Sequence, residues 1–394
     1  MQKDQVINNR YQILSELGKG GYGQVYKVLD LVKSQEFALK LESFNRGSIS
    51  QEIKILQDLQ GGEGIPKVHD NGKFNSFSYM VMDSLGQNLS SMRRSLSGFS
   101  LNTVVLLLKE ALNRIEYIHS KGYIHRDIKP QQFLVGPKDS IYLVDYGISK
   151  KYIIDGHHMA FQSHCERAGS SSYASVNSHI GIRLSRRDDL ESLIYMGVFL
   201  KQGYLPWQQR KTANHNRKWQ DTFTIKRNTK DEELFCHCPK QFIAMLGYVR
   251  SIRFEEKPNY DYLRDLICSI KSEYSLSLKN FDWAVVSKGK RDEDFGKTVE
   301  VSKRGSEKKK KKKTRNNRRN RTANPIVSKT SFLVIQSNTF LQIPSAISKD
   351  VSRNSQDSDI SDCETIKVLL PGFSDRKSIF KILTQFRQEL IKAK

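Results

Sequence analysis

Two polar motifs lie near the middle of this 394-residue chain, with a short apolar run before the second. Residues 125–133 read HRDIKPQQF, and the triplet Asp145-Tyr146-Gly147 begins eighteen residues after Asp127. The apolar run at 141–144 leads directly into the triplet, as a buried strand leads into a loop. A lone Asp-aromatic-Gly triplet is most often a turn or a cap, but its distance from HRD favours a shared functional site.

The residue types in these motifs suit phosphoryl transfer, which depends on positioning and on the neutralisation of negative charge. Asp127 carries a carboxylate that can accept the proton of a substrate hydroxyl, and Lys129 can extend beside it toward a phosphate. Asp145 offers the oxygen ligands that Mg²⁺ prefers. We therefore predict that Asp127 and Lys129 are catalytic and that Asp145 binds a metal ion.

The N-terminal part of the chain carries a glycine-rich pattern. Residues 18–25 read GKGGYGQV, which fits GxGxxGxV, and apolar strand-like runs flank them at 11–17 and 24–32. Glycines at such spacing let the backbone approach phosphate groups closely. A plain hairpin turn is the simpler interpretation of one such pattern, so the pattern needs support from elsewhere in the chain.

That support comes from a lysine and a glutamate further along. Lys40 follows the apolar residues at 37–39, as on a strand that contacts nucleotide phosphates, and Glu52 lies on a predicted helix after Ser50. Taken singly, these two side chains are most simply two solvated charges. The ordered set of glycine loop, Lys40, Glu52, HRD and DYG resembles the motif set of protein kinases.

Composition restricts the environment of the chain. Its five cysteines form no CxxC pair, which is typical of a reduced, intracellular protein. The tripeptide at 236–238, Cys-His-Cys, has no second pair at ligand spacing, which favours incidental thiols over a zinc site. The N-terminus has no apolar signal core, and no run reaches the length of a membrane span. We expect the protein to be a monomer and to have no transmembrane segment. We expect it to be located in the cytoplasm, the nucleus or both.

Much of the net charge of +23 comes from a basic block at 303–321, which contains twelve Lys or Arg residues against Glu307 alone. Such a block cannot bury itself and is expected to be disordered. Three interpretations stay open: a solvated linker, a signal for an import receptor, or an arm that binds a polyanion such as nucleic acid or acidic lipid. No aromatic residues interleave the block, which favours contacts with a charged backbone over base stacking.

The predicted fold is α+β and bilobal, with a small β-rich lobe, a larger α-helical lobe and a largely disordered basic C-terminal tail. An apolar stripe at 104–118 predicts a helix that faces the core, and further helices are expected over 189–200, 240–252 and 260–270. The predicted boundaries are an N-terminal extension 1–9, a kinase domain 10–286 with N-lobe 10–83, hinge 84–88 and C-lobe 89–286, a disordered tail 287–373, and an amphipathic helix 374–394.

Residues 10–286 resemble the casein kinase 1 family of Ser/Thr protein kinases, with the tau-tubulin kinases as the nearest alternative. The matching phrases are Gly64-Ile65-Pro66, HRDIKP at 125–130, SRRDDLES at 185–192 and Leu205-Pro206-Trp207-Gln208. In that family a Ser-Ile-Asn-like element replaces the usual Ala-Pro-Glu, and Ser175-Val176-Asn177 fits it. The resemblance implies a non-specific Ser/Thr kinase that uses ATP and Mg²⁺ and acts on acidic or already phosphorylated protein substrates.

The resemblance also implies roles by position. Lys40 would pair with Glu52, and Asp189 would support the catalytic loop from a helix beneath it. Residues expected to bind the nucleotide are Leu17, Gly18, Gly20, Gly23, Val25, Ala38, Lys40, Glu52, Met82, Leu85 and Leu134.

The chain departs from the family pattern at two places. Gln132 stands where kinases carry a metal-binding Asn; it keeps the amide oxygen but adds one methylene group, roughly 1.5 Å of reach, in a shell where Mg²⁺ demands near-octahedral geometry. Ser172 stands where the family has an Arg that helps to bind phosphorylated substrates, while Lys226 and Arg227 fall in the region of its other anion-binding base. Two functions therefore stay open: an active kinase, with Gln132 as a metal ligand, or a catalytically weak pseudokinase scaffold tethered through its basic tail.

Overall fold

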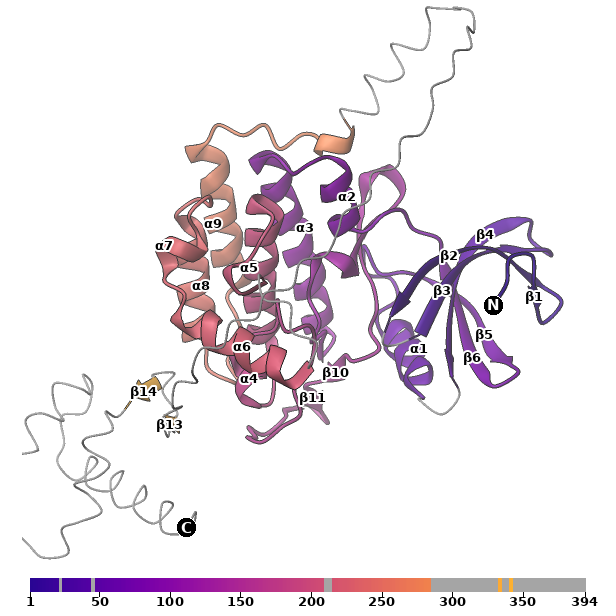
Figure 1. Cartoon of the computed structure of the whole chain (residues 1–394), viewed down its shortest axis with the longest axis horizontal. Helices are drawn as coiled ribbons and strands as arrows, with labels where there is room; N and C mark the ends of the chain where they lie inside the picture. The colour runs from indigo at the N-terminus through magenta and orange to yellow at the C-terminus, as the bar shows by residue number, and fades with distance from the viewer. Residues whose placement is uncertain (21–22, 44–46, 209–214, 285–331, 335–339, 343–394) are drawn as a thin grey trace, which may run out of the picture. The chain divides into compact units, whose positions relative to one another are not determined.

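The computed structural model describes residues 1–20, 23–43, 47–208, 215–284, 332–334 and 340–342. The chain divides into two units, Met1–Lys309 and Lys310–Lys394. The first unit holds a small lobe built on a β-sheet and a larger lobe built mainly of helices (Figure 1). The bilobal α+β architecture predicted from the sequence is confirmed.

The small lobe is an antiparallel sheet in the order β1-β2-β3-β4-β6-β5. Its strands are β1 (Val6–Ile7), β2 (Tyr11–Gly20), β3 (Gly23–Asp30), β4 (Gln35–Ser43), β5 (Val68–Phe74) and β6 (Phe77–Asp83). Alternate apolar side chains face one side, as the two-residue period of a strand requires, and form a core that includes Ile7, Tyr11 and Ile13. Part of the predicted N-terminal extension, residues 1–9, therefore belongs to the sheet.

One helix, α1 (Ser48–Asp58), accompanies the sheet. Its buried residues Ile49, Glu52, Ile55 and Leu56 recur at the spacing of one helical face. Three of these are apolar and join the core of the large lobe, whereas Glu52 is a buried carboxylate and needs a charged partner. The helix predicted after Ser50 is confirmed, and it begins two residues earlier, at Ser48.

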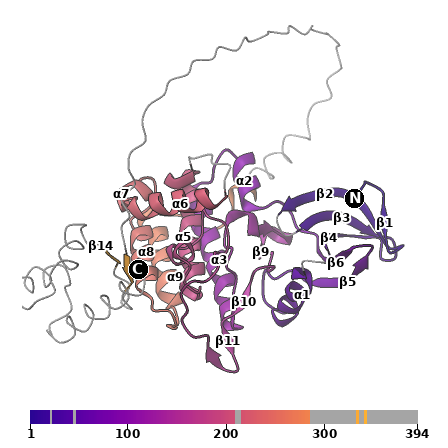
Figure 2. The same cartoon turned by 60° about the horizontal axis from the view of Figure 1, so that its bottom comes forward.

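The large lobe is mainly helical. Its helices are α2 (Leu89–Ser95), α3 (Leu101–Ser120), α4 (Val176–Ile180), α5 (Arg186–Gln202), α6 (His215–Asn228), α7 (Asp231–Leu234), α8 (Gln241–Ser251) and α9 (Tyr260–Glu273). In both views α3 lies beside α5 and α9 (Figures 1 and 2). The helices predicted at 104–118, 189–200, 240–252 and 260–270 are confirmed.

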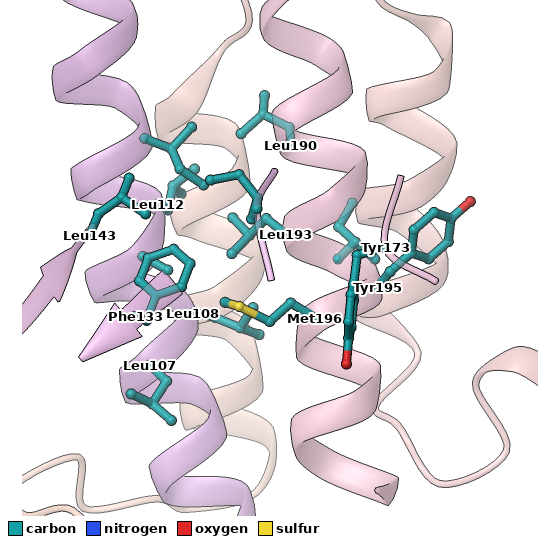
Figure 3. Close-up of a cluster of buried hydrophobic side chains, with 14 of the residues drawn as sticks. Leu107, Leu108, Leu112, Phe133, Leu143, Tyr173, Leu190, Leu193, Tyr195 and Met196 are labelled. Atoms are coloured by element: carbon teal, nitrogen blue, oxygen red, sulfur yellow. The ribbon is translucent and has the colours of Figure 1, made fainter. Parts of the chain in front are cut away.

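Helix α3 carries the predicted apolar stripe into the core. Val104, Leu107, Leu108, Ala111, Leu112, Ile115 and Ile118 are all buried. Figure 3 shows Leu107, Leu108 and Leu112 of α3 in one cluster with Leu193 and Met196 of α5. The helix begins where the side chain of Ser100 accepts a hydrogen bond from the amide of Thr103, as an N-cap residue does.

Short elements connect α3 to α4 and form the loops of the site. They are β7 (Tyr123–Ile124), η1 (Pro130–Gln132), β8 (Phe133–Val135), η2 (Pro137–Asp139), β9 (Ile141–Leu143), β10 (Lys150–Lys151), β11 (Ile153–Ile154) and β12 (His157–His158). A last 3₁₀ turn, η3 (Pro206–Gln208), precedes α6. Strands β8 and β9 pair with each other as an antiparallel hairpin, with HRD before β8 and DYG after β9, so both motifs lie toward its open end, where Phe133 pairs with Leu143.

After α9 the chain returns to the start of α3. Asp282 accepts hydrogen bonds from the backbone N–H (2.8 Å) and hydroxyl (2.6 Å) of Ser100, and Asp282 N–H donates to Thr103 Oγ1 (2.9 Å). The indole N–H of Trp283 donates to Asp139 Oδ1 (2.9 Å), and its ring stacks on Phe281 with centroids 4.4 Å apart. We call residues 276–284 the return segment; it fastens the end of this lobe to η2 and α3.

In the second unit, β13 (Phe332–Val334) pairs antiparallel with β14 (Phe340–Gln342). The basic block 303–321 and the helix expected over 374–394 lie outside the described residues, so both stay predictions. Among the residues that the structure describes, no helix is both long and apolar enough to cross a membrane.

Candidate active site

A buried lysine joins the two lobes at the site. Strand β4 places Lys40 so that its Nζ donates to Glu52 Oε2 and to Asp145 Oδ1, both at 2.7 Å. Lys40 is 5 % exposed and Glu52 is 1 % exposed, so this ion pair is shielded from water. The pairing of Lys40 with Glu52 expected from the resemblance is present, and Asp145 completes the group.

Burial and the neighbouring charge of Lys40 shift the pKa values of Glu52 and Asp145 in opposite directions. Burial raises the pKa of Glu52 above its ordinary value, although the ammonium of Lys40 acts in the other direction. Burial also raises the pKa of Asp145, but Lys40 and the amide of Gln132 outweigh it and hold that pKa below the ordinary value. Asp145 is therefore a carboxylate at neutral pH, as a metal ligand must be.

The backbone around Asp145 is held from both lobes. Asp145 has φ 67°, a left-handed conformation that is costly for a residue with a side chain. The next residue, Tyr146, donates its backbone N–H to Glu52 Oε1 (3.1 Å) and is fully buried, with its ring 5.2 Å from that of His125. Glu52 thus fixes Lys40 through one carboxylate oxygen and the DYG backbone through the other.

The catalytic loop brings Asp127 and Lys129 together. Lys129 Nζ donates to Asp127 Oδ2 (2.5 Å) and to Ser170 Oγ (2.9 Å). The second oxygen, Asp127 Oδ1, is buried and has no hydrogen-bond partner among the described residues. A buried carboxylate oxygen without a donor is costly unless a bound group supplies one, and a substrate hydroxyl is such a donor.

Asp189 of α5 supports this loop. Its two oxygens accept the backbone N–H groups of His125 (2.7 Å) and Arg126 (2.8 Å), and Oδ2 also contacts His119 Nε2 (3.0 Å). Arg126 has φ 72°, so these bonds hold a strained backbone in place. Asp189 therefore has the supporting position that the resemblance implies.

Gln132 links the two acidic residues. Its amide nitrogen donates to Asp145 Oδ2 (2.8 Å) and to Asp127 Oδ2 (3.3 Å), and the side chain is 5 % exposed. Two carboxylates and an amide oxygen within one hydrogen-bond network are the hard oxygen donors that fit Mg²⁺. The donor set therefore suits the ion, although the amide of Gln132 presents its nitrogen, and not its oxygen, to the carboxylates.

Several of the residues predicted to bind the nucleotide lie in the β2–β3 hairpin of the small lobe. In the β2–β3 hairpin Gly18 pairs with Val25 and Gly20 with Gly23, while Leu17 beside them is exposed. A side chain at Gly18 or Gly20 would meet no atom within 4 Å, whereas one at Gly23, with φ 128°, would clash with the carbonyl oxygen of Leu41. Glycine is thus required by the backbone at Gly23 and leaves open space at the other two positions.

The expected adenine-contacting residues come from both lobes. Ala38 of β4 lies opposite Met82 of β6, and the next residues lead into the hinge with Leu85. Leu134 of β8 forms a bridge with Asn88, so the large lobe reaches the hinge from the other side. The backbone pairings bring β4, β6 and β8 next to the hinge, and the role of these residues in nucleotide binding stays a prediction.

Two features of the site were missing from the sequence prediction. Ser170 contacts Lys129, and a cavity of about 760 Å³ lies beside the catalytic loop. Its lining includes three basic residues, Arg126, Lys150 and Arg167, together with Glu166 and Trp219. No residue spacing signals this cavity, because its basic side chains come from the catalytic loop, from β10 and from the segment before Gly169.

The structure does not confirm the predicted position of Lys226. It was expected in an anion-binding region, but it is 2 % exposed and its Nζ donates to the backbone oxygens of Ala174 (2.5 Å) and Ser171 (3.2 Å). Buried inside the lobe, it cannot receive a phosphate from a substrate. Helix α6, which carries it, was not predicted, because its sequence is polar; among its residues 218–228 the buried ones are Trp219, Thr222 and Lys226.

A comparison with protein-family models agrees with this geometry. The family described as "Protein kinase domain" matches residues 11–268. The match covers both lobes up to the middle of α9 and includes every residue of the candidate site.

Proposed function

Because the chain belongs to the protein kinase family, we propose that it transfers the γ-phosphate of ATP to serine and threonine hydroxyls of proteins, as the casein kinase 1 family does. The observation that carries this proposal is the buried Asp127 Oδ1, which lacks a hydrogen-bond donor among the described residues. A pure binding module has no need for such an oxygen beside a lysine and a second carboxylate.

Different residues have different roles in the proposed transfer. Asp127 Oδ1 accepts the proton of the substrate hydroxyl, while Lys129 holds the other oxygen of the same carboxylate. Lys40, held by Glu52, contacts the nucleotide phosphates in this proposal. Mg²⁺, held by Asp145 and Gln132, would supply charge neutralisation at the phosphates.

The Ser/Thr preference and the kinase subfamily rest on the sequence resemblance and on one structural feature. In the Ser175-Val176-Asn177 element, Ser175 Oγ (2.7 Å) and Asn177 Nδ2 (2.9 Å) donate to Asp188 Oδ1. The element is therefore fastened to α5 by hydrogen bonds from two neutral side chains to the carboxylate of Asp188. The basic lining of the nearby cavity supports a preference for acidic substrates although Ser172 carries no charge.

The second candidate is a weakly active scaffold. Gln132 favours it, because its amide nitrogen occupies both carboxylates where a metal ion would bind. The five residues Lys40, Glu52, Asp127, Lys129 and Asp145 favour the active enzyme, because they form two sets of short contacts, Lys40 with Glu52 and Asp145, and Lys129 with Asp127.

The deciding experiment is transfer of the γ-phosphate from Mg·ATP to an acidic serine peptide, comparing the unaltered protein with Asp127→Asn. We expect transfer by the first and a loss of at least about 10²-fold in the second, the range of general-base removal. Transfer by neither protein, with several peptides and with Mn²⁺ as well, would replace the kinase proposal with the scaffold.

A further inference from the structure

The segment 169–174, which we call the wall, lies against the catalytic loop through Gly169 and Ser170. A Cβ atom at Gly169 would lie 3.4 Å from Asp127 Oδ1, and Ser170 Oγ accepts from Lys129. A substrate whose hydroxyl reaches Asp127 must therefore lie against this segment. A role for this wall in substrate binding rests on the proposed kinase function.

Three residues of this wall, Ser171, Ser172 and Ala174, are held through their carbonyl groups. Lys226 Nζ donates to Ser171 O (3.2 Å) and to Ala174 O (2.5 Å), and Trp207 Nε1 donates to Ser172 O (2.7 Å). The ammonium lies over two aromatic rings, 4.7 Å from the centroid of Tyr195 and 4.9 Å from that of Trp207. Aromatic faces stabilise a cation, so this pocket is built for a lysine that reaches the wall from inside.

Charged groups from the surrounding elements face Lys226. His179 of α4 has its Nε2 at 3.2 Å from Nζ. On α5, Glu191 accepts from the hydroxyl of Tyr195 (2.6 Å), and Arg250 of α8 donates to that same hydroxyl (2.9 Å). The carboxylate of Glu191 favours the charged lysine, and the guanidinium of Arg250 disfavours it.

Burial has the largest effect on the pKa values of Lys226 and His179. It lowers the pKa of Lys226 to about 7 and, with help from the nearby Lys226 and Arg167, lowers that of His179 to about 3. At neutral pH His179 is therefore uncharged, and the proton that exchanges belongs to Lys226. A charged lysine donates strong hydrogen bonds to both carbonyls, and His179 Nε2 also lies 3.2 Å from the carbonyl oxygen of Ser171.

We propose that Lys226 is a positioning residue that fixes the substrate-facing wall from behind, and that loss of its proton loosens the wall and weakens binding of the protein substrate. Hydrogen bonds from a charged donor are roughly twice as strong as neutral ones, so the two states hold Ser171 and Ala174 with different strength. ATP contacts none of these groups in the predicted arrangement, so its affinity is independent of this proton.

The test measures substrate and nucleotide kinetics between pH 6 and 9, using a serine peptide that has no group titrating in this range. We expect the KM for the peptide to rise roughly threefold to tenfold as pH passes about 7, with little change in the KM for ATP. Lys226→Met should show the high peptide KM at every pH. Lys109→Met, which removes an exposed lysine from α3, should behave like the unaltered protein. A peptide KM that follows the same pH profile in Lys226→Met as in the unaltered protein would overturn the proposal.

A second readout needs neither a variant nor enzymatic activity. Amide hydrogen exchange of residues 170–176 in the unaltered protein, corrected for the intrinsic pH dependence of exchange, should show less protection above pH 7 than below it. Constant protection across this range contradicts the proposal even if the protein proves to be a scaffold. The exchange result thus separates a failure of this inference from a failure of the kinase assignment.

Discussion

Gln132 differs from the expected Asn by one methylene group, and the structure shows which groups the longer side chain contacts. The amide nitrogen reaches both Asp127 and Asp145, so the side chain links the proposed base directly to the proposed metal ligand. The sequence predicted a metal-binding residue at this position. It could not predict the orientation of the amide, which depends on two carboxylates that the fold brings together.

We expect Gln132→Asn to raise turnover with Mg²⁺ by about tenfold, because a shorter amide frees the carboxylates for a small ion that needs near-octahedral geometry. The ratio of the rate with Mn²⁺ to the rate with Mg²⁺ should fall. Steady-state kinetics with each ion provide the measurement. Gln131→Asn is the matched control, since Gln131 is exposed and its side chain donates a long hydrogen bond to Ser90 Oγ (3.4 Å) away from both carboxylates. Unchanged or lower turnover in Gln132→Asn would show that the longer side chain suits this site.

The lowered pKa of the buried Lys226 also predicts how the free energy of unfolding depends on pH. Its pKa in the folded protein is about 7, below the ordinary value of 10.5. Between these values the unfolded chain binds the proton and the folded chain does not, so this group lowers stability as pH falls from 10.5 to 7 and has no further effect below 7. The free energy of unfolding of the unaltered protein relative to Lys226→Met should therefore increase from pH 7 to pH 9 in denaturant titrations. A flat difference would mean that the lysine keeps its proton when buried.

Among the elements, the helices with a clear apolar stripe were predictable from sequence and α6 was not. Helix α3 buries seven predicted residues on one face, and α5 begins at Arg186 because Ser185 and Asp188 form a capping box. Helix α6 buries a tryptophan, a threonine and a lysine, and the partners of that lysine are carbonyl groups about fifty residues away. Local patterning cannot reveal a face whose burial depends on such distant polar groups.

The loop 168–174 depends on Gly169 for its path past the catalytic loop. Gly169 has φ 84°, and a Cβ there would lie 2.4 Å from the carbonyl oxygen of Arg126. Gly169→Ala should therefore displace this loop and lower kcat by more than about tenfold, while circular dichroism shows a folded protein.

Gly247 provides the matched control for that substitution. It lies inside α8, where an added Cβ meets no atom within 4 Å. Gly247→Ala should keep full activity and raise the free energy of unfolding by about 0.5–1 kcal/mol, the difference in helix propensity. Equal kcat in the two variants would show that the loop tolerates a side chain at residue 169.

Over the whole molecule, the return segment extends the folded unit beyond the matched family region, which ends at residue 268. Trp283 is 9 % exposed and packs on Phe281 and Phe99. Trp283→Ala in the full-length chain should lower the free energy of unfolding by about 3–5 kcal/mol, as expected for a large buried side chain. Thermal unfolding, with Tyr274→Ala as an exposed aromatic control, is the measurement. A melting temperature equal to that of the control would mean that the segment is not part of the cooperative unit.

The placement of the tryptophans has a spectroscopic consequence. The chain has three, and two of them border the Lys226–His179 pair: Trp207 lies 4.9 Å from the lysine nitrogen, and Trp219 lies 4.7 Å from the histidine ring. The emission of an excited indole shifts when a neighbouring charge appears or disappears. The intrinsic fluorescence of the protein should thus report the protonation of one buried amine, which would allow the wall of the active site to be followed in real time without any label.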